Sequence, residues 1–168
     1  PPSGMNLNGS VAELGPLRPY PTADGSFSLY SAQFGEAFHN SAGALNEAQA
    51  KFVRPAQLER FQGDRPLAML DVCVGLGYNS AAVLEALPAA KTGLHWWGLE
   101  LDRRPLELAL EQLHFQQLWS PAVLQQLRAL HADGHWSSAT STGELLWGDA
   151  RATVSNIPAK QQFDLILQ

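Results

Sequence analysis

Hydrophobic positions from residue 67 onward fall into two alternating kinds of segment. Four short runs are almost continuously apolar, as expected of strands covered on both faces: LAMLDVCV (67–74), GLHWWGLELD (93–102), ELLWGD (144–149) and FDLILQ (163–168). Stretches between them have apolar residues at helical spacing, as in AVLQQLRAL (122–130). Strands that alternate with helices form parallel βαβ units, so the pattern predicts an α/β fold with a doubly wound, mostly parallel, Rossmann-like sheet.

Polar and proline residues set the expected boundaries of the helices. Asn79 or Ser80 can cap a helix over AAVLEAL. Pro105 suits the first turn of a helix that reaches about residue 118, and a serine-proline pair at 120–121 starts another. The segment HADGHWSSATSTG (131–143) is polar and is predicted to be a loop.

The first third of the chain has a different pattern. Residues 1–25 are rich in Pro, Gly and Ser, which predicts an extended arm, and they lead into a DGS turn signal (24–26). Alternation over SFSLYS (26–31) predicts a short strand with that turn as a hairpin tip. Residues 44–61 have helical spacing, with Pro55 as the expected break between two helical pieces.

These patterns divide the chain into two parts of one domain. Residues 1–66 form an N-terminal arm, hairpin and helical cap, and residues 67–168 form the Rossmann-like core. A chain of 168 residues that is 45% hydrophobic suffices for one core. Because the last apolar run has no turn or helix after it, we expect the core to be incomplete and truncated at its C-terminal end.

Composition narrows the classes of protein. The single cysteine, Cys73, excludes an intramolecular disulfide framework, and no CxxC pair indicates zinc. The HADGH segment (131–135) has metal-binding residue types but no fourth ligand, so we expect no metal site. No apolar run approaches the ~20 residues of a membrane span, which predicts a cytoplasmic protein without a membrane partner. The net charge of −5 gives no support to phosphate binding over the whole surface.

Acidic residues and glycines gather at one predicted edge of the sheet. Asp71 lies in the first core strand, Gly75 and Gly77 follow it, Glu100 closes the second strand and Asp149 follows the third. Ligands of such sheets bind at the carboxyl ends of the strands, where glycines allow the backbone to approach a ligand and a helix N-terminus adds its dipole. A carboxylate at the end of the second strand can accept hydrogen bonds from both ribose hydroxyls, so the pattern indicates an adenosine pocket.

The loop itself distinguishes among adenosine cofactors. GLGYNS (75–80) has serine in place of the third glycine of a dinucleotide fingerprint, and no Walker sequence is present. DVCVGLG (71–77) matches three of the four marked positions of the S-adenosylmethionine (SAM) loop, Asp/Glu-x-Gly-x-Gly-x-Gly, with Cys73 in place of the first glycine. These residues favour SAM, while a dinucleotide and a purely structural turn stay open as alternatives.

Two residues of the loop have more than one interpretation. Asp71 can accept a hydrogen bond from the amino group of the cofactor or from backbone N–H groups of the loop. Cys73 is predicted to be a small buried residue whose thiol pKa is raised by the apolar run around it, and we do not assign it to catalysis.

Three motifs indicate a family. The DGSFSL turn (24–29), the block GEAFHNSAGALNE (35–47) and GLGYN (75–79) resemble the MnmC/MnmD-like family, the MnmC2 domain of class I SAM-dependent methyltransferases. The resemblance covers about residues 17–168. By position, it implies that Gly75, Gly77, Tyr78 and Asn79 line the methionine part of SAM, that Glu100 holds the ribose and that Asp149 and Ala150 lie at the adenine.

The same resemblance implies an activity and its partners. The family methylates an amine, the aminomethyl group of the tRNA wobble uridine, which makes tRNA a partner and implies an oxidoreductase as a further domain or a separate protein. It also implies a catalytic acid after the fourth core strand, beyond Gln168. A small-molecule amine methyltransferase and a non-catalytic SAM-binding module stay open as alternatives.

The N-terminal segment, where the resemblance to the family is closest, supplies four further candidate site residues. Tyr30, Glu36, His39 and Glu47 are hypothesised to face the pocket as substrate or cofactor residues. The alternative is a local network of capping and packing contacts within the N-terminal segment.

Overall fold

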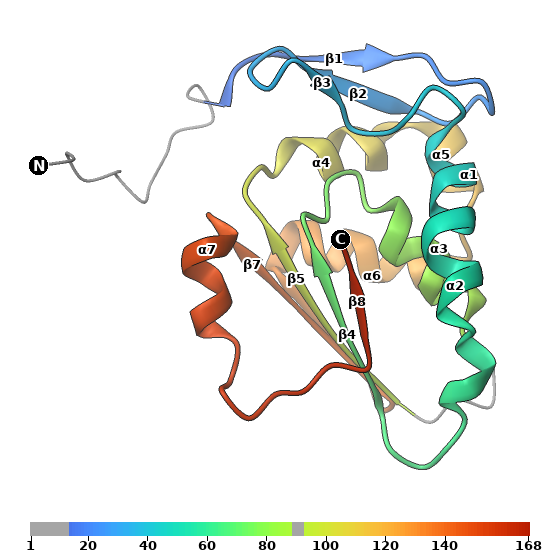
Figure 1. Ribbon diagram of the computed structural model, residues 1–168, viewed down its shortest axis with the longest axis vertical. Coiled ribbons are helices and arrows are strands. Elements are labelled where there is room, and N and C mark those ends of the chain that lie inside the picture. Colours follow the sequence, from blue (N-terminus) through green and yellow to red (C-terminus); the bar gives the residue numbers. More distant parts are fainter. Residues whose placement is uncertain (1–13, 89–92) are drawn as a thin grey trace, which may run out of the picture.

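The computed structural model describes residues 14–88 and 93–168 and contains a five-stranded central sheet (Figure 1). The strand order is β6-β7-β5-β4-β8, and every neighbouring pair is parallel except β6 with β7. The strands are β4 (Leu67–Val72), β5 (Leu94–Glu100), β6 (His135–Ser137), β7 (Ser141–Trp147) and β8 (Leu165–Leu167). The predicted α/β class with a mostly parallel sheet is therefore confirmed.

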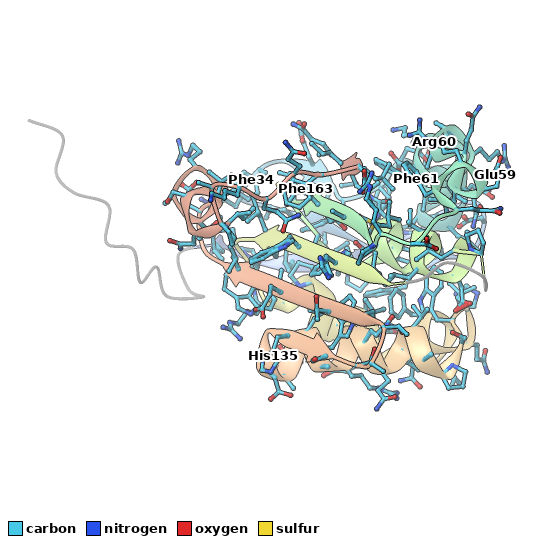
Figure 2. The ribbon with its side chains drawn as sticks, turned by 90° about the horizontal axis from the view of Figure 1, so that it is seen from below. Phe34, Glu59, Arg60, Phe61, His135 and Phe163 are labelled. Atoms are coloured by element: carbon cyan, nitrogen blue, oxygen red, sulfur yellow. The ribbon has the colours of Figure 1, made fainter. Side chains whose placement is uncertain are left out.

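Helices cover one face of this sheet most completely. α3 (Tyr78–Ala86) and α6 (Pro121–Asp133) pack on the face that carries Met69, Trp96 and Leu145, all of which belong to one buried apolar cluster (Figure 1). Figure 2 shows α6 on this side of the sheet and Phe163 on the other side. The remaining helices after β5 are α4 (Arg104–Glu111), α5 (Leu113–Gln117), α7 (Ala150–Thr153) and a 3-10 turn (Val154–Asn156).

A second, smaller sheet stands above the carboxyl ends of the parallel strands (Figure 1). It consists of β1 (Leu17–Tyr20), β2 (Ser28–Ser31) and β3 (Glu36–Ala37), paired antiparallel in that order. The predicted hairpin is thus present, and Asp24 lies in its connection. Asp24 also accepts a hydrogen bond from the Asn46 N–H at 3.0 Å, so the turn residue helps to cap the helix that follows.

That helical segment runs without a break through Pro55. α1 (Ala44–Ala48), a π-helical turn (Gln49–Val53) and α2 (Arg54–Ala56) are consecutive, so two helical pieces are present but the break between them lies two residues after Pro55. A proline ring clashes with the carbonyl four residues earlier in a regular α-helix, and the wider π turn just before Pro55 relieves this clash. The helical path instead ends at Gln57, which has a φ of 47°, and a 3-10 turn (Leu58–Phe61) follows.

Three other boundaries differ from the sequence-based expectation. Gly77, with a φ of 93°, precedes the first residue of α3, so Asn79 and Ser80 lie inside the first turn and neither is the cap. The helix from Pro105 is interrupted at Gln112, whose backbone is extended, and continues as α5. The serine-proline prediction is confirmed, because the Ser120 hydroxyl accepts a hydrogen bond from Val123 N–H at 3.3 Å.

The prediction of a polar loop at 131–143 is wrong for most of the segment, which contains the end of α6, strand β6 and the first three residues of β7. Trp136 anchors β6: its side chain is buried and packs against the Trp96 ring, with centroids 5.6 Å apart. Gly143 makes room for it, since a Cβ there would lie 2.2 Å from the Trp136 ring. One large aromatic side chain therefore fixes a strand whose other residues are polar.

The predicted arm falls partly on residues 1–13, which lie outside the described residues. Within the described ranges, none of the helices has the length and apolar character needed to cross a membrane.

Candidate functional site

The loop between β4 and α3 lies at the carboxyl edge of the central sheet. Its backbone is left-handed at three positions, with φ values of 64° at Cys73, 59° at Gly75 and 93° at Gly77. The N–H groups of Cys73 and Val74 donate to the Leu99 carbonyl at 2.9 and 3.3 Å, which fastens the loop to β5. Cys73 thus has the conformation that favours glycine at this position of the motif. It is exposed, so the prediction that it is buried is wrong, although partial burial raises the pKa of its thiol.

Side chains from other elements pack closely against both glycines of the loop. A Cβ on Gly77 would lie 3.2 Å from Leu106 Cδ1, so α4 can approach the loop only because this side chain is absent. A Cβ on Gly75 would lie 3.5 Å from the ring of Phe38, which reaches down from the small sheet. The peptide backbone at Gly75 therefore lies directly beneath Phe38.

Glu100, at the end of β5, supports this loop. One carboxylate oxygen accepts the Gly75 N–H at 2.6 Å, and the other accepts the N–H groups of Leu101 and Asp102 at 2.8 Å each. The side chain is buried, and burial raises the pKa of Glu100 above its ordinary value. A carboxylate has about four acceptor sites, so about one is left for a ligand such as a ribose hydroxyl.

Asp71 lies in the interior behind the loop. It is 1% exposed and accepts a hydrogen bond from the Ser80 hydroxyl, whose oxygen accepts in turn from the Trp96 indole N–H at 2.8 Å. Burial raises the pKa of Asp71 to about 7, and the nearby Glu100 carboxylate adds to the shift. Asp71 holds the first turn of α3 through Ser80, a contact that was not predicted, and its predicted interaction with the cofactor stays a prediction.

Tyr78 and Asn79, adjacent in the first turn of α3, point into different surroundings. The Tyr78 side chain is fully buried, stacks edge-on with Phe115 at 5.0 Å between centroids, and donates its hydroxyl to the Phe27 carbonyl at 2.9 Å. Only its backbone can therefore face the loop. Asn79 Oδ1, in contrast, is a buried oxygen with no hydrogen-bond partner among the described residues. Buried acceptors without a partner are rare, so a ligand N–H is a natural partner for this oxygen.

The predicted adenine residues lie at the end of β7. The Asp149 carboxylate accepts from the Arg151 backbone N–H at 2.9 Å and pairs with its guanidinium. The hydrogen bond from the Arg151 side chain lowers the pKa of Asp149 to about 2. Gly148 N–H donates to the Glu100 carbonyl at 2.8 Å, which joins the ends of β7 and β5. Asp149 and Ala150 therefore come just after β7, the strand whose end lies beside Glu100.

Two of the N-terminal candidates belong to a packing and capping network. The His39 ring shares a 2.8 Å hydrogen bond with the Ser28 hydroxyl and stacks edge-on with Tyr78, and burial lowers the pKa of its imidazole. Glu47 accepts the Asn40 N–H at 2.9 Å and pairs with Lys51. These contacts match the alternative interpretation of the two residues.

The other two N-terminal candidates lie on opposite faces of the small sheet. Tyr30 carries the Arg18 guanidinium over its ring at 4.4 Å, and its cross-strand neighbour on β3 is Ala37. Glu36 pairs with Ser31 one position along and is exposed. The structure therefore brings Glu36, but not Tyr30, onto the same face of the small sheet as Phe38.

Sequence reasoning missed three residues that the structure places around the loop. Phe38 covers Gly75, while Ser80 and Trp96 hold Asp71. Phe38 lies inside the block GEAFHNSAGALNE and could have been found from its position there. The pairing of Ser80 with Trp96 joins residues from α3 and β5 and has no signal in the linear sequence.

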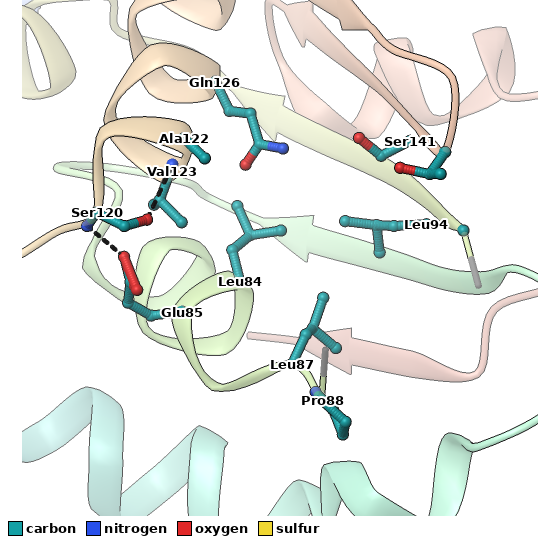
Figure 3. Close-up of a pocket in the computed structure, with 12 residues that line it drawn as sticks. Leu84, Glu85, Leu87, Pro88, Leu94, Ser120, Ala122, Val123, Gln126 and Ser141 are labelled. Atoms are coloured by element: carbon teal, nitrogen blue, oxygen red, sulfur yellow. Dashed lines mark hydrogen bonds between the residues drawn. The ribbon is translucent and has the colours of Figure 1, made fainter. Parts of the chain in front are cut away.

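A separate cavity of about 310 Å³ lies at the other end of the central sheet (Figure 3). Its lining includes Leu94 and Ser141, the first residues of β5 and β7, together with Leu84 and Val123 from α3 and α6. Because the glycine loop lies at the carboxyl ends of these strands, this cavity is not part of the candidate site. Over the same described ranges, no group of three or more His, Cys, Asp or Glu side chains is arranged to hold a metal ion.

Comparison with known proteins gives one curated relative and one solved structure of interest. No family model matches the chain. An uncharacterized protein of Methanocaldococcus jannaschii is 38% identical over 63 residues, which are 38% of this chain and 17% of that protein. The crystal structure of MnmC2 from Aquifex aeolicus superposes with a TM-score of 0.72 and 25% identity, over 90% of this chain and 48% of that chain. The chain thus spans about half the length of the solved MnmC2 chain.

The superposition extends over both sheets, since it includes nine-tenths of the chain. It agrees with the motifs at 24–29, 35–47 and 75–79, which lie in the hairpin connection, the β3–α1 segment and the glycine loop. The fold is methyltransferase-like, and the chain is an MnmC2-like protein.

Proposed function

We propose that the chain binds SAM at the loop between β4 and α3 and promotes methylation of an amine, with the aminomethyl group of a tRNA wobble uridine as the acceptor. The observation that carries the proposal is the glycine loop at the carboxyl edge of an MnmC2-like fold, next to a buried Asn79 oxygen that has no partner in the described part of the chain. Such an edge is where α/β sheets bind nucleotide-like ligands.

The residues of the loop suit the separate parts of SAM. The backbone at Gly75 and Gly77 has no side chain to exclude the methionine part, and Asn79 Oδ1 can accept a hydrogen bond from its ammonium group. Glu100 has about one acceptor site left for a ribose hydroxyl. Asp149 and Ala150, beside the end of β5, are the proposed adenine residues.

When bound, SAM supplies an electrophilic methyl group on a sulfonium centre. The acceptor amine must present a free lone pair in line with that group, so most of the acceleration that this chain can provide comes from orientation and exclusion of water. Phe38 over Gly75 supplies an apolar cover for such a site. The acid that would receive the amine proton stays a prediction for a segment beyond Gln168.

Calorimetric titration with SAM tests the cofactor part of the proposal. We expect a dissociation constant below about 1 mM, which corresponds to about −4 kcal/mol. Replacing Glu100 with Gln should weaken binding at least about tenfold, because it removes a charged acceptor and loosens the Gly75 N–H contact. Glu107→Gln, an exposed residue of α4, is the matched control and should bind as the unsubstituted chain does. A dissociation constant weaker than millimolar for the unsubstituted chain would refute the proposal.

The acceptor needs a second experiment, because one observation favours a small-molecule amine. The net charge of −5 opposes attraction to a polyanion such as tRNA. Methyl-labelled SAM is offered together with undermodified tRNA that carries an aminomethyl wobble uridine, and separately with small amines. Label in the tRNA supports the proposal, and label only in small amines supports the second candidate. SAM binding without any transfer indicates a binding module.

A further inference from the structure

The inner face of the small sheet looks onto the glycine loop. On β2 and β3, Ser31 lies opposite Glu36, and Phe38 N–H donates to the Leu29 carbonyl at 2.9 Å. Opposed residues of an antiparallel pair project to the same side, and side chains alternate along each strand, so these four residues share one face. Leu29 and Ser31 are buried, and Phe38 contacts the glycine loop, so this face looks onto the loop. Ser28 on the other face is buried as well, through its contact with His39.

Phe38 connects that face to the loop. Its ring lies 3.5 Å from the position that a Cβ on Gly75 would occupy, yet the residue is 36% exposed. One side of the ring therefore contacts the loop and the other side is open. An open aromatic surface beside the proposed methyl donor is suited to an apolar or cationic part of the acceptor.

Glu36, the first residue of β3, lies two residues before Phe38, which follows the strand and bonds Leu29 on the same side of the sheet. Its side chain is exposed and has neither a hydrogen bond nor an ion pair within residues 14–88 and 93–168. The nearby Arg18 guanidinium does not neutralise it, because Arg18 stacks on Tyr30 on the outer face. A carboxylate without a partner, next to an aromatic ring, has the chemistry to bind an ammonium group.

Two other carboxylates beside the hairpin, Asp24 and Glu47, are occupied. Asp24 accepts from Ser26 and from the Asn46 N–H, and Glu47 is held by Lys51 and the Asn40 N–H. Of these three carboxylates, Glu36 is thus the one free to bind a ligand.

We propose that Glu36 binds the ammonium form of the methyl-accepting amine and that Phe38 forms the apolar wall between this group and the glycine loop. The inference rests on the proposed function, which it deepens by assigning the acceptor side of the site. Glu36 is a positioning residue: it raises the local concentration of a cationic acceptor beside the loop. The bound ammonium must release a proton to solvent before its nitrogen lone pair can attack the methyl group, so Glu36 acts on binding of the acceptor and not on the transfer step.

A binding titration tests this assignment without requiring turnover. The probe is the free nucleoside 5-aminomethyluridine, titrated into the full chain with and without S-adenosylhomocysteine, and its N-acetylated form is the neutral control ligand. Glu36→Gln should weaken binding of the amine about tenfold and remove its dependence on salt, whereas the neutral ligand should bind equally to both proteins. Glu36→Asp should restore part of the affinity.

Matched variants separate the site from general effects on the surface. Glu59→Gln removes an exposed carboxylate of the 3-10 turn far from β3 (Figure 2), and Phe34→Ala removes the exposed ring at the end of the β2–β3 turn. Both variants should bind the amine as the unsubstituted chain does, whereas Phe38→Ala should weaken binding of the amine several-fold.

The result that overturns the inference is equal amine affinity for Glu36→Gln and the unsubstituted chain, or no preference for the amine over its N-acetylated form. SAM calorimetry on the same proteins separates the two proposals. If SAM binds and the amine does not, the acceptor site is refuted and the cofactor proposal stands. If the amine binds through Glu36 and SAM does not, the proposed function is refuted and the amine site stands.

Discussion

At the scale of single residues, Asp71 makes the stability of the protein dependent on pH. Its pKa rises from 3.8 to about 7 on folding, so between these values the folded state keeps a proton that the unfolded chain releases. Rising pH therefore lowers the free energy of unfolding across this window, by up to about 4 kcal/mol in total. Below pH 3.8 Asp71 is protonated in both the folded and the unfolded state, so it does not lower the free energy of unfolding there.

Asp71→Asn removes the titrating group and leaves an oxygen that can accept from Ser80. We expect its free energy of unfolding in urea to exceed that of the unsubstituted chain at pH 8, with the difference shrinking toward pH 4. Asp133→Asn, an exposed residue at the end of α6, is the control and should follow the unsubstituted chain. Parallel stability curves for Asp71→Asn and the unsubstituted chain would mean that Asp71 is ionised in the folded protein.

Cys73 allows a second prediction at this scale. Its φ of 64° is favourable for glycine and unfavourable for residues with a Cβ. Cys73→Gly should therefore be more stable than Cys73→Ala by about 1 kcal/mol, because alanine keeps the backbone strain and glycine releases it. Urea unfolding of the two variants at one pH checks this, and equal midpoints would show that the loop relaxes around alanine.

At the scale of elements, Tyr78 joins α3 to the N-terminal hairpin. Its hydroxyl bonds the Phe27 carbonyl just before β2, and its ring packs against His39 and Phe115. Tyr78→Phe keeps the ring and loses the hydrogen bond, so we expect a loss of about 1 kcal/mol and faster amide exchange in β2. Tyr30→Phe, which keeps the ring beneath Arg18 on the outer face, should change neither quantity.

The elements also show how far the sequence predicts the fold. β4, β5 and β8 lie in apolar runs, which indicate buried strands without any other signal, whereas only the second half of β7 lies in such a run. β6 was missed because its neighbours are polar and its anchor, Trp136, is fixed by a glycine on another strand. The break expected at Pro55 lies at Gln57, because a π turn that packs against α3 accommodates the proline ring within the helix.

The candidate site was predicted to a similar extent. The motif positions correctly placed the glycine loop between the first core strand and the helix that follows it, and the structure adds a left-handed backbone at Gly75 and Gly77. They did not give the direction of side chains, so Tyr78 was expected near the cofactor although its side chain lies in the core. Contacts between distant segments, such as Phe38 over Gly75, depend on how the small sheet is placed above the large one.

At the scale of the whole molecule, the central sheet is covered unequally on its two faces. Register places Ile166, Leu70, Trp97 and Glu144 in one row across β8, β4, β5 and β7, on the face opposite α3 and α6. Ile166 is 57% exposed in this row, whereas Met69 and Trp96 on the other face are at most 1% exposed. β8 is also an edge strand among the strands described. Exposed apolar side chains on an edge strand favour pairing with another chain.

For a polypeptide of residues 1–168, we therefore expect self-association through β8 and the adjoining face. Its weight-average sedimentation coefficient should rise with protein concentration, and Ile166→Lys should reduce that rise without lowering the free energy of unfolding, because the side chain is already largely exposed. Leu113→Lys is the control: Leu113 is 66% exposed on α5, away from the sheet, and its substitution should leave the concentration dependence unchanged. The same concentration dependence in Ile166→Lys and the unsubstituted chain would place any association elsewhere, because a lysine on an edge strand opposes pairing of that strand wherever it is the contact.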